Sequence, residues 1–476
     1  MKKKYKNIIL FLNIKKGSNK FLSYKYINLN IKYIILNLFI FLIIILLISY
    51  FNNKLIINKK YKDIQKNINI TFLGNIKSKI NIAIYSYCII NGGRARITSI
   101  LVNNFYKIKL FKIYLLTVEN KENNEYYIPE DIKRFVVKND LVKILRKNKI
   151  DILIYELDYI NEIEILNNLH KIKVIFYHHS SNFDWIYSNY THFKLIYRAF
   201  KNSKYFVSIV PFENDYLFKN WGIRSILFDN FMTYEYNSVI PSDLSSDIIL
   251  MIGRGKAKKK RFKIGIEAME YIILENLKYE LQIISDLSKI EKLQNLINNL
   301  NLNNNIKFIG YSQNPEFFFK NASLNLFPSI SEAFPMVIIE TKIFGIPNII
   351  MGLDYLTISK GGTIIIYDDT PETLAKEALK LLNNKKKKKN LAKQSRKSMK
   401  KFNNDYLILK WIELILSVYN GDNYYNIIRE KNKKISEKEI SYIINNQVNI
   451  FKIRDFYFEN ITINNYINFN FMENLK

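Results

Sequence analysis

Short apolar runs alternate with amphipathic stretches along most of the chain. Between residues 79 and 238 the apolar runs are KINIAIYSY (79–87), FKIYLLTV (111–118), DILIYEL (151–157) and KVIFYHH (173–179). Segments with apolar residues at helical spacing lie between or after them, at 94–105, 141–147 and 161–170. Continuous apolar strands that alternate with helices are typical of parallel βαβ units. The pattern therefore predicts a Rossmann-like domain over residues 79–238.

A second series of the same kind follows. Its predicted strands are 246–254, 280–286, 305–311, 322–328, 348–352 and 362–368, and its predicted helices are 264–275, 289–301 and 371–383. This series predicts a second doubly wound α/β domain over residues 239–404. One more helix is expected over residues 405–420, and the tail over residues 421–476 has no clear pattern.

An unbroken apolar run precedes both domains. Residues 33–51 carry no charge and a single internal Asn, Asn37. Such a run forms a helix of roughly 28 Å, about the thickness of the bilayer hydrocarbon. We predict one transmembrane helix, after a basic segment (1–32) and before a polar stalk (52–78). Lysines lie on both sides of the run, so the positive-inside rule favours a cytoplasmic N-terminus only slightly. The sequence does not decide on which side of the membrane the two domains lie.

Composition narrows the possible partners and sites. The formal net charge is +30, from 72 Lys and Arg against 42 Asp and Glu. Such an excess of positive charge usually suggests a protein that binds nucleic acid. Here Asn, Ile, Lys and Tyr are abundant in apolar and polar segments alike, which indicates a general bias in composition rather than a basic patch. We therefore predict no nucleic-acid partner. The lysine run at 385–389 is expected to be a solvated face or a loop, while an anionic substrate or membrane surface stays compatible. Cys88 is the only cysteine, which excludes an internal disulfide and a cysteine-based zinc site.

One apolar segment, FPSISEAFPMVIIETKIFG (327–345), carries two carboxylates. Pro335 suits the first turn of a helix and Gly345 the residue after its end. Glu332 then lies in the loop before the helix and Glu340 lies inside it. The free N–H groups near residues 333–337 and the helix dipole make an anion site at the carboxyl edge of a parallel strand. Spacing alone favours this site no more than an ordinary core helix with capping acids.

The segment resembles the E-x7-E signature of the family 4 retaining glycosyltransferases. The residues in register are Pro328, Ser329, Glu332, Phe334, Pro335, Glu340, Gly345 and Pro347, while Ala333 and Thr341 replace a common Gly and Ala. The resemblance extends over roughly residues 79–420. It implies a GT-B fold, with two Rossmann-like domains that face a cleft and with helix 405–420 crossing back to the first domain. It places donor contacts at Glu340, Ser331, Phe334, Pro335, Met336 and Val337.

A second motif, IGRGKAKKKRFKIGIEAM (252–269), follows a predicted strand and opens a helix. It resembles the basic element that holds the donor diphosphate in this family. Arg254 and Lys260 then correspond to the basic pair, and Arg261 stands where Gly is usual. Lys258 and Lys259 are adjacent alternatives to Lys260. Without the strand before it, the stretch would read as one of the chain's many basic loops.

Two further motifs fall on the first domain. Gly92 and Gly93 form a glycine-rich βα turn that resembles the family's acceptor-side loop, with Arg96 at the Arg of that motif. Two adjacent histidines, His178 and His179, end a predicted strand. The family places a His there, facing the donor sugar, and His179 is favoured because it lies further along. Departures from the family pattern occur at Ala95, Ser285 and Leu287.

The resemblance implies transfer of a sugar from a UDP- or GDP-sugar to a hydroxyl of a glycan, lipid or protein acceptor, with retention at the anomeric carbon. Arg254 and Lys260 would stabilise the departing diphosphate, Glu332 would hold sugar hydroxyls and Glu340 the ribose, and no metal or other cofactor is expected. Two alternatives remain. One is a membrane-anchored sugar-nucleotide binder without activity, which the departures keep open. The other is a phosphorylase of the same fold, against which the E-x7-E signature argues.

Overall fold

The computed structural model describes residues 78–90, 92–156, 172–180, 205–210, 225–253, 258–286, 290–312, 314–353 and 356–421, and Lys438. The predicted transmembrane helix (33–51), the predicted helix 161–170 and the tail beyond residue 421, apart from Lys438, lie outside these residues. Within the described ranges, every helix is too short or too polar to cross a bilayer.

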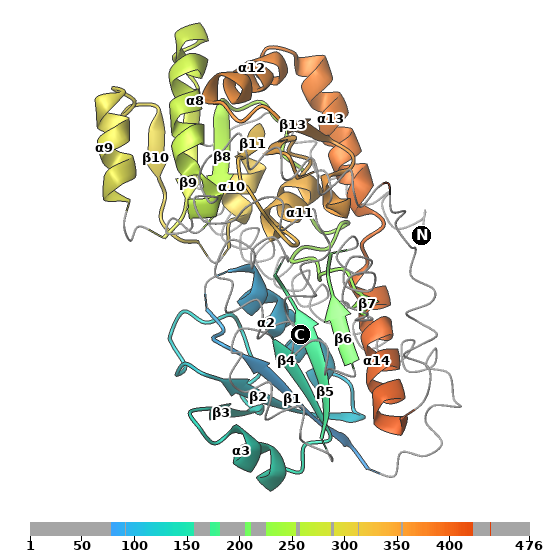
Figure 1. The fold of residues 1–476 in the computed structure, drawn as a ribbon. Helices are drawn as coiled ribbons and strands as arrows, with labels where there is room; N and C mark the ends of the chain where they lie inside the picture. Colours follow the sequence, from blue (N-terminus) through green and yellow to red (C-terminus); the bar gives the residue numbers. More distant parts are fainter. Residues whose placement is uncertain are drawn as a thin grey trace, which may run out of the picture. The chain divides into compact units, whose positions relative to one another are not determined.

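The first sheet has seven parallel strands in the order β3-β2-β1-β4-β5-β6-β7 (Figure 1). The strands are β1 (Ile80–Ser86), β2 (Phe111–Thr117), β3 (Lys133–Val136), β4 (Ile152–Glu156), β5 (Lys173–His178), β6 (Tyr205–Ser208) and β7 (Ile226–Leu227). The helices α2 (Gly93–Tyr106) and α3 (Leu141–Lys147) connect them. The strands β3, β6 and β7, each of four residues or fewer, were not predicted.

The second sheet has six parallel strands in the order β10-β9-β8-β11-β12-β13. These are β8 (Ile248–Ile252), β9 (Glu280–Ile284), β10 (Ile306–Phe308), β11 (Leu324–Phe327), β12 (Asn348–Met351) and β13 (Thr363–Ile366). The helices are α8 (Phe262–Glu275), α9 (Glu291–Asn299), α10 (Glu316–Lys320), α11 (Met336–Ile343), α12 (Pro371–Leu382), α13 (Lys385–Met399) and α14 (Asn404–Asn420), with short 3-10 turns η4 (Lys258–Lys260) and η5 (Thr357–Ser359). Both sheets therefore confirm the predicted pair of parallel α/β units.

Helix α14 leaves the second unit and packs against the first sheet, beside β6 and β7 (Figure 1). Its Trp411 is fully buried and meets the rings of Tyr177 and Phe228 edge-on, each with a centroid separation of 5.0 Å. Lys173 at the start of β5 also donates a hydrogen bond to the carbonyl oxygen of Tyr419, 2.6 Å away. A large buried aromatic side chain contributes roughly 3 kcal/mol or more to stability, so these contacts tie the end of the second unit to the first.

The lysine run at 385–389 forms the first residues of helix α13. Lysine is a good helix former, and Asn384 caps the helix by accepting a hydrogen bond from the Lys387 N–H. Four of the five lysines are exposed, and Lys388 is buried. The run is thus a solvated helical face rather than a loop, with one lysine turned inward.

Gly362 makes a stability prediction possible, because its φ of +69° lies in the left-handed region and a Cβ there would lie 2.2 Å from the Ser395 backbone nitrogen. A Gly362→Ala substitution combines a backbone penalty of about 1–2 kcal/mol with overpacking of about 1–3 kcal/mol. We expect the free energy of unfolding to fall by about 2–5 kcal/mol. The measurement is urea unfolding of the full chain in detergent, followed by far-UV circular dichroism.

Gly421 provides the matched control. Its φ of +77° is similar, but a Cβ there meets no atom within 4 Å. Gly421→Ala therefore carries the backbone penalty alone, and its unfolding midpoint should shift by less than half as much. Equal shifts of the two midpoints would show that the contact with Ser395 contributes nothing.

Candidate functional site

The segment with the two carboxylates forms the loop after β11 and the helix α11. Pro335 is the N-cap of α11, which ends at Ile343, and Gly345 adopts a φ of +74° just past the end. Glu332 lies in the loop and Glu340 in the second turn of the helix, and both carboxylates are buried. A buried carboxylate is costly unless it is paired, so the partners of these two residues define the site.

Lys260 is the partner of Glu332. It ends the 3-10 turn η4 after β8, and its ammonium donates a hydrogen bond to the Glu332 carboxylate. The ammonium also lies 5.1 Å from the centre of the Phe327 ring, at the end of β11. Although burial works in the other direction, Lys260 and the neighbouring Lys259 lower the pKa of Glu332. The structure thus brings together two predicted site residues that are 72 positions apart; Arg254, the other predicted basic residue, lies outside the described residues.

Arg261 begins helix α8 with a left-handed backbone, at a φ of 52°. This explains why a glycine is usual at this position of the motif, since glycine adopts that conformation without strain. The Arg261 side chain is held by an ion pair with Asp369, which follows β13. The ion pair offsets part of the cost of the strained backbone and fixes the turn that carries Lys260.

Arg96 is the partner of Glu340. It comes from helix α2 of the first unit, and its guanidinium forms an ion pair with the Glu340 carboxylate. Thr233, in the segment between the two sheets, donates a second hydrogen bond to the same carboxylate oxygen at 2.8 Å. Arg96 also lies over the Tyr126 ring, 5.1 Å from its centre. The acceptor-side arginine and the carboxylate predicted to hold the ribose are therefore in direct contact.

The two groups of this pair have pKa shifts of opposite sense. Burial raises the pKa of Glu340, and Arg96 and Thr233 offset only part of that rise. The carboxylate in turn raises the pKa of Arg96, against the opposing effect of burial. The first shift disfavours an ionised pair and the second favours it. We take the pair as ionised, because a guanidinium stays protonated in proteins and two donors face one carboxylate oxygen.

The glycine turn lies against the first residue of α11. Gly92 has a φ of +116°, and a Cβ added at Gly93 would lie 3.2 Å from Cγ of Met336. The lack of a side chain at Gly93 allows this close approach. Ser331, Phe334, Pro335 and Met336 are buried around the helix start, and Val337 is half-buried. The predicted acceptor loop and the predicted donor helix therefore meet at the α11 N-terminus.

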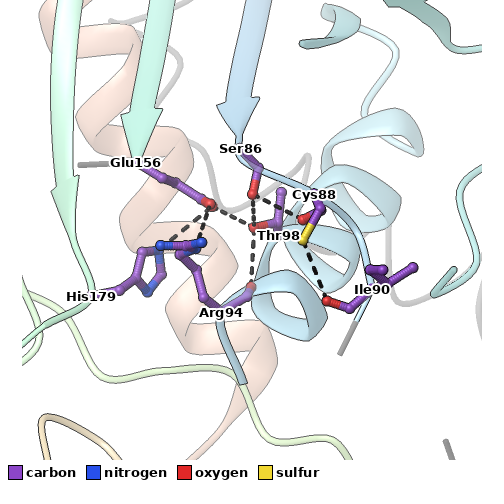
Figure 2. Close-up of polar contacts among 7 residues, drawn as sticks. All are labelled: Ser86, Cys88, Ile90, Arg94, Thr98, Glu156 and His179. Carbon is purple, nitrogen blue, oxygen red and sulfur yellow. Dashed lines mark hydrogen bonds and ion pairs between the residues drawn. The ribbon is translucent and has the colours of Figure 1, made fainter. Parts of the chain in front are cut away.

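The two adjacent histidines have different surroundings. His178 ends β5 and is fully buried, with its ring 5.9 Å from that of Phe206. Burial lowers its pKa well below the usual range. His179 lies just beyond the strand, with 7% of its side chain exposed, and contacts Glu156 (Figure 2). His179 is thus the one in contact with a carboxylate at the carboxyl edge of the first sheet, and its position facing the donor sugar stays a prediction.

Glu156 was not predicted as a site residue. It ends β4, its side chain is fully buried, and three groups from two other segments surround its carboxylate (Figure 2). Thr233 was missed as well. A charged residue at the end of an otherwise apolar strand was a usable signal for Glu156, whereas no pattern marked Thr233. Among the described residues, no group of three or more His, Cys, Asp and Glu side chains is placed to hold a metal ion.

Lys342, two residues after Glu340, makes stability depend on pH. Its side chain is buried, and its amine donates hydrogen bonds to the carbonyl oxygens of Ile358 and, at 3.1 Å, Lys360. Burial, with a smaller contribution from Lys401, lowers its pKa from 10.5 to about 7. Between these values the unfolded chain binds a proton that the folded chain lacks, so stability should rise with pH by up to about 1.4 kcal/mol per unit.

The test compares urea unfolding at several pH values between 7 and 10 for the wild type and Lys342→Met. The substitution should remove this part of the slope, whereas Lys376→Met, at an exposed position of α12, should leave the slope unchanged. An equal slope in wild type and Lys342→Met would contradict the assignment.

The part of the chain that contains Lys260, Glu332 and Glu340 is similar to known proteins. Residues 235–398, which include Lys260, Glu332 and Glu340, match the family model of glycosyl transferases group 1. An uncharacterised glycosyltransferase of Haemophilus influenzae is 23% identical over 183 residues, which are 37% of this chain and 52% of that protein. The chain spans between 21% and 52% of the length of the curated relatives that it matches.

Solved structures share the fold over most of the described residues. A sucrose-phosphate synthase from Thermosynechococcus elongatus superposes with a TM-score of 0.60 at 14% identity, covering 72% of this chain and all of that one. HepE from Anabaena, solved in complex with UDP and glucose, gives a TM-score of 0.57 at 13% identity, covering 71% of this chain and 99% of that one. At such identities the likeness shows the fold, which is of the GT-B type.

Proposed function

Taking residues 235–398 as a glycosyl transferases group 1 domain, we propose that the chain transfers a sugar from a nucleotide diphospho-sugar to a hydroxyl acceptor. The donor is a UDP- or GDP-sugar, the anomeric configuration is retained and the reaction needs no metal. The observation that carries the proposal is the pair of buried carboxylates, Glu332 and Glu340, each held by a basic side chain at the start of α11.

The helix start supplies the binding chemistry for the diphosphate. The first N–H groups of a helix lack intrahelical partners, and the helix dipole adds positive potential there. Lys260 lies beside this end, on the neighbouring βα turn. We propose that the ammonium of Lys260 moves from Glu332 to the diphosphate when the donor binds. The freed carboxylate of Glu332 then accepts hydrogen bonds from sugar hydroxyls.

Glu340 takes the ribose in this proposal. Its carboxylate is held by Arg96 and Thr233 without a ligand. The two ribose hydroxyls are donors of the same kind, so the nucleotide exchanges one set of hydrogen bonds for another at little net cost. Arg96 is then released toward the diphosphate or the acceptor, beside the glycine turn.

The reaction itself needs no protein nucleophile. The bond between the anomeric carbon and the diphosphate oxygen breaks, and its electron pair stays on the diphosphate. The acceptor oxygen bonds to the same face of the carbon, and its proton passes to the leaving diphosphate. Lys260, Arg254 and the α11 N-terminus stabilise the negative charge that develops there.

A membrane location is part of the proposal and rests on the sequence. The uncharged run over residues 33–51 has the length of a transmembrane helix. An enzyme anchored in this way is suited to a lipid-linked or membrane-protein acceptor. HepE, which shares the fold, was solved with UDP and glucose, and this makes UDP-sugars the first donors to try.

The test incubates the full chain in detergent with a panel of UDP- and GDP-sugars, with and without EDTA, and measures nucleotide release. We expect slow hydrolysis of one donor, unaffected by EDTA. Donor binding without release, even when alcohols are offered as acceptors, would favour a sugar-nucleotide binder without activity. Absence of binding for every donor would overturn the proposed function.

A further inference from the structure

The carboxyl edge of the first sheet carries a buried polar cluster around Glu156 (Figure 2). Thr98, one turn into α2, donates a hydrogen bond to Glu156 Oε1. His179 Nε2 lies 3.5 Å from the same oxygen, and Arg94 Nε lies 3.8 Å from Oε2. The partners therefore come from the first turns of α2, directly after the glycine turn, and from the residue after β5.

The cluster is more than a buried charge with its counter-ions. A fully buried carboxylate at the end of an apolar strand is expensive, and an apolar residue would fill the same place without that cost. Although burial works in the other direction, His179, Arg94 and Thr98 lower the pKa of Glu156, so that it stays ionised. A permanent charge is thus kept beside the one histidine that this strand edge presents.

The imidazole of His179 is held from two sides. The Tyr177 ring lies against it with a centroid separation of 3.9 Å, and Glu156 faces its Nε2. Tyr177 is itself fixed, because its hydroxyl donates a hydrogen bond to Asn230 at 3.0 Å. A neutral imidazole has one N–H and one bare nitrogen, and the partner of one nitrogen decides the state of the other. A carboxylate at Nε2 keeps the proton there and leaves Nδ1 as an acceptor.

We propose that Glu156 is a positioning residue that orients His179 and Arg94 together at the sugar end of the site. It fixes His179 with Nε2–H toward the carboxylate, so that Nδ1 accepts a hydrogen bond from a hydroxyl of the bound sugar or of the acceptor. It also holds Arg94 in the first turn of α2, which sets the glycine turn against Met336. This inference rests on the proposed function, but its first test does not.

The first test uses the ligand-free full chain in detergent, labelled with ¹⁵N in histidine. The chain has four histidines, and His179→Gln identifies the signals of His179. In the wild type the ¹⁵N shifts of His179 should show protonated Nε2 and bare Nδ1 near pH 8. Glu156→Gln keeps the size of the side chain but removes its charge, and the signals should shift toward a mixture of tautomers. Unchanged signals in Glu156→Gln would overturn the positioning role.

The second test measures turnover of the UDP- or GDP-sugar that the panel identifies. Glu156→Gln should lower kcat by about 10- to 100-fold, the range typical when a partner that orients a functional imidazole is lost. Binding of free UDP or GDP should stay within about twofold, because Glu156 belongs to the first sheet and not to the nucleotide side. Thr98→Val, which removes a neighbouring hydrogen bond and keeps the Glu156–His179 contact, should keep most of the activity.

The outcomes separate the two claims. If Glu156→Gln shifts the His179 signals but leaves kcat unchanged, the role of Glu156 in turnover is overturned. If Thr98→Val loses as much activity as Glu156→Gln, that role is also overturned, because the cluster would then be merely structural. If the wild type turns over no donor, the proposed function fails and the role in turnover falls with it. The histidine signals still decide in that case whether Glu156 orients His179.

Discussion

Replacing Glu340 with alanine is expected to lower kcat/KM for the sugar donor by about 30- to 5,000-fold, through loss of nucleotide affinity. Truncation of one member of a buried, hydrogen-bonded charge pair costs about 2–5 kcal/mol. Here it removes the acceptor for the ribose hydroxyls and leaves the guanidinium of Arg96 buried without its partner carboxylate. The measurement is calorimetric binding of UDP and GDP to the full chain, together with donor hydrolysis.

Two variants separate this effect from a general loss of structure. Thr233→Val removes the second donor to the same carboxylate oxygen but keeps the carboxylate, and nucleotide affinity should stay within about tenfold of the wild type. Glu377→Ala removes a half-buried carboxylate of the same unit, paired with the exposed Lys380, and should change nothing measurable. Wild-type nucleotide affinity in a folded Glu340→Ala variant would remove Glu340 from the site.

Replacing Lys260 with alanine is expected to lower kcat by about 100- to 1,000-fold, with a smaller effect on the affinity for the nucleotide. Groups that stabilise the charge developing in a transition state have effects of this size. The substitution also leaves Glu332 buried with its main positive partner removed, so the pKa of Glu332 should rise. The measurement is donor hydrolysis and transfer at saturating donor, as a function of pH.

The neighbouring lysines are the controls for this prediction. Lys263→Ala removes an exposed lysine of the first turn of α8, which pairs only loosely with Glu267, and should leave kcat unchanged. Lys259→Ala should have an effect of less than about tenfold, because Lys259 lowers the pKa of Glu332 less than Lys260 does. A loss in Lys259→Ala as large as that in Lys260→Ala would show that the wrong lysine was assigned.

In the ligand-free site, each of the two buried carboxylates is paired with a basic side chain. Glu332 is held by Lys260 from the same unit, and Glu340 is held by Arg96 from the first unit and Thr233 from the connecting segment. Both carboxylates are thus kept ionised and oriented before any donor arrives. In the proposed mechanism, hydroxyls of the donor replace the basic partners of the two carboxylates, and the released positive charges interact with the diphosphate of the donor. Preorganisation of this kind reduces the reorganisation needed at the moment of reaction.

Much of the architecture followed from local pattern. The apolar runs predicted the long strands of both sheets, and the Pro335 to Gly345 signals placed α11 almost to the residue. The strands β3, β6 and β7 were missed; β3 and β7 are the short edge strands of the first sheet, and β6 is an inner strand of four residues. The sequence left the lysine run open between a solvated face and a loop, and the helix α13 that decides for the face depends on its Asn384 cap as much as on the lysines.

The contacts within the site were less accessible to sequence reasoning. Arg96 and Glu340 are 244 residues apart, and Glu156 meets Thr98 across 58 residues. Only the folded chain brings the members of each pair together. The resemblance assigned roles to Arg96 and Glu340 separately and gave no reason to expect an ion pair between them. Glu156 belongs to no motif, so its role emerges from burial and from its partners.

The most direct test of the central claim is an experimental structure of the full chain with UDP bound. We predict that the ribose hydroxyls lie within hydrogen-bond distance of the Glu340 carboxylate and that Arg96 no longer pairs with it. We also predict that the diphosphate lies at the start of α11, with the Lys260 ammonium turned from Glu332 toward it. A nucleotide bound elsewhere, or one bound while both ion pairs stay intact, would contradict the assignment of the site.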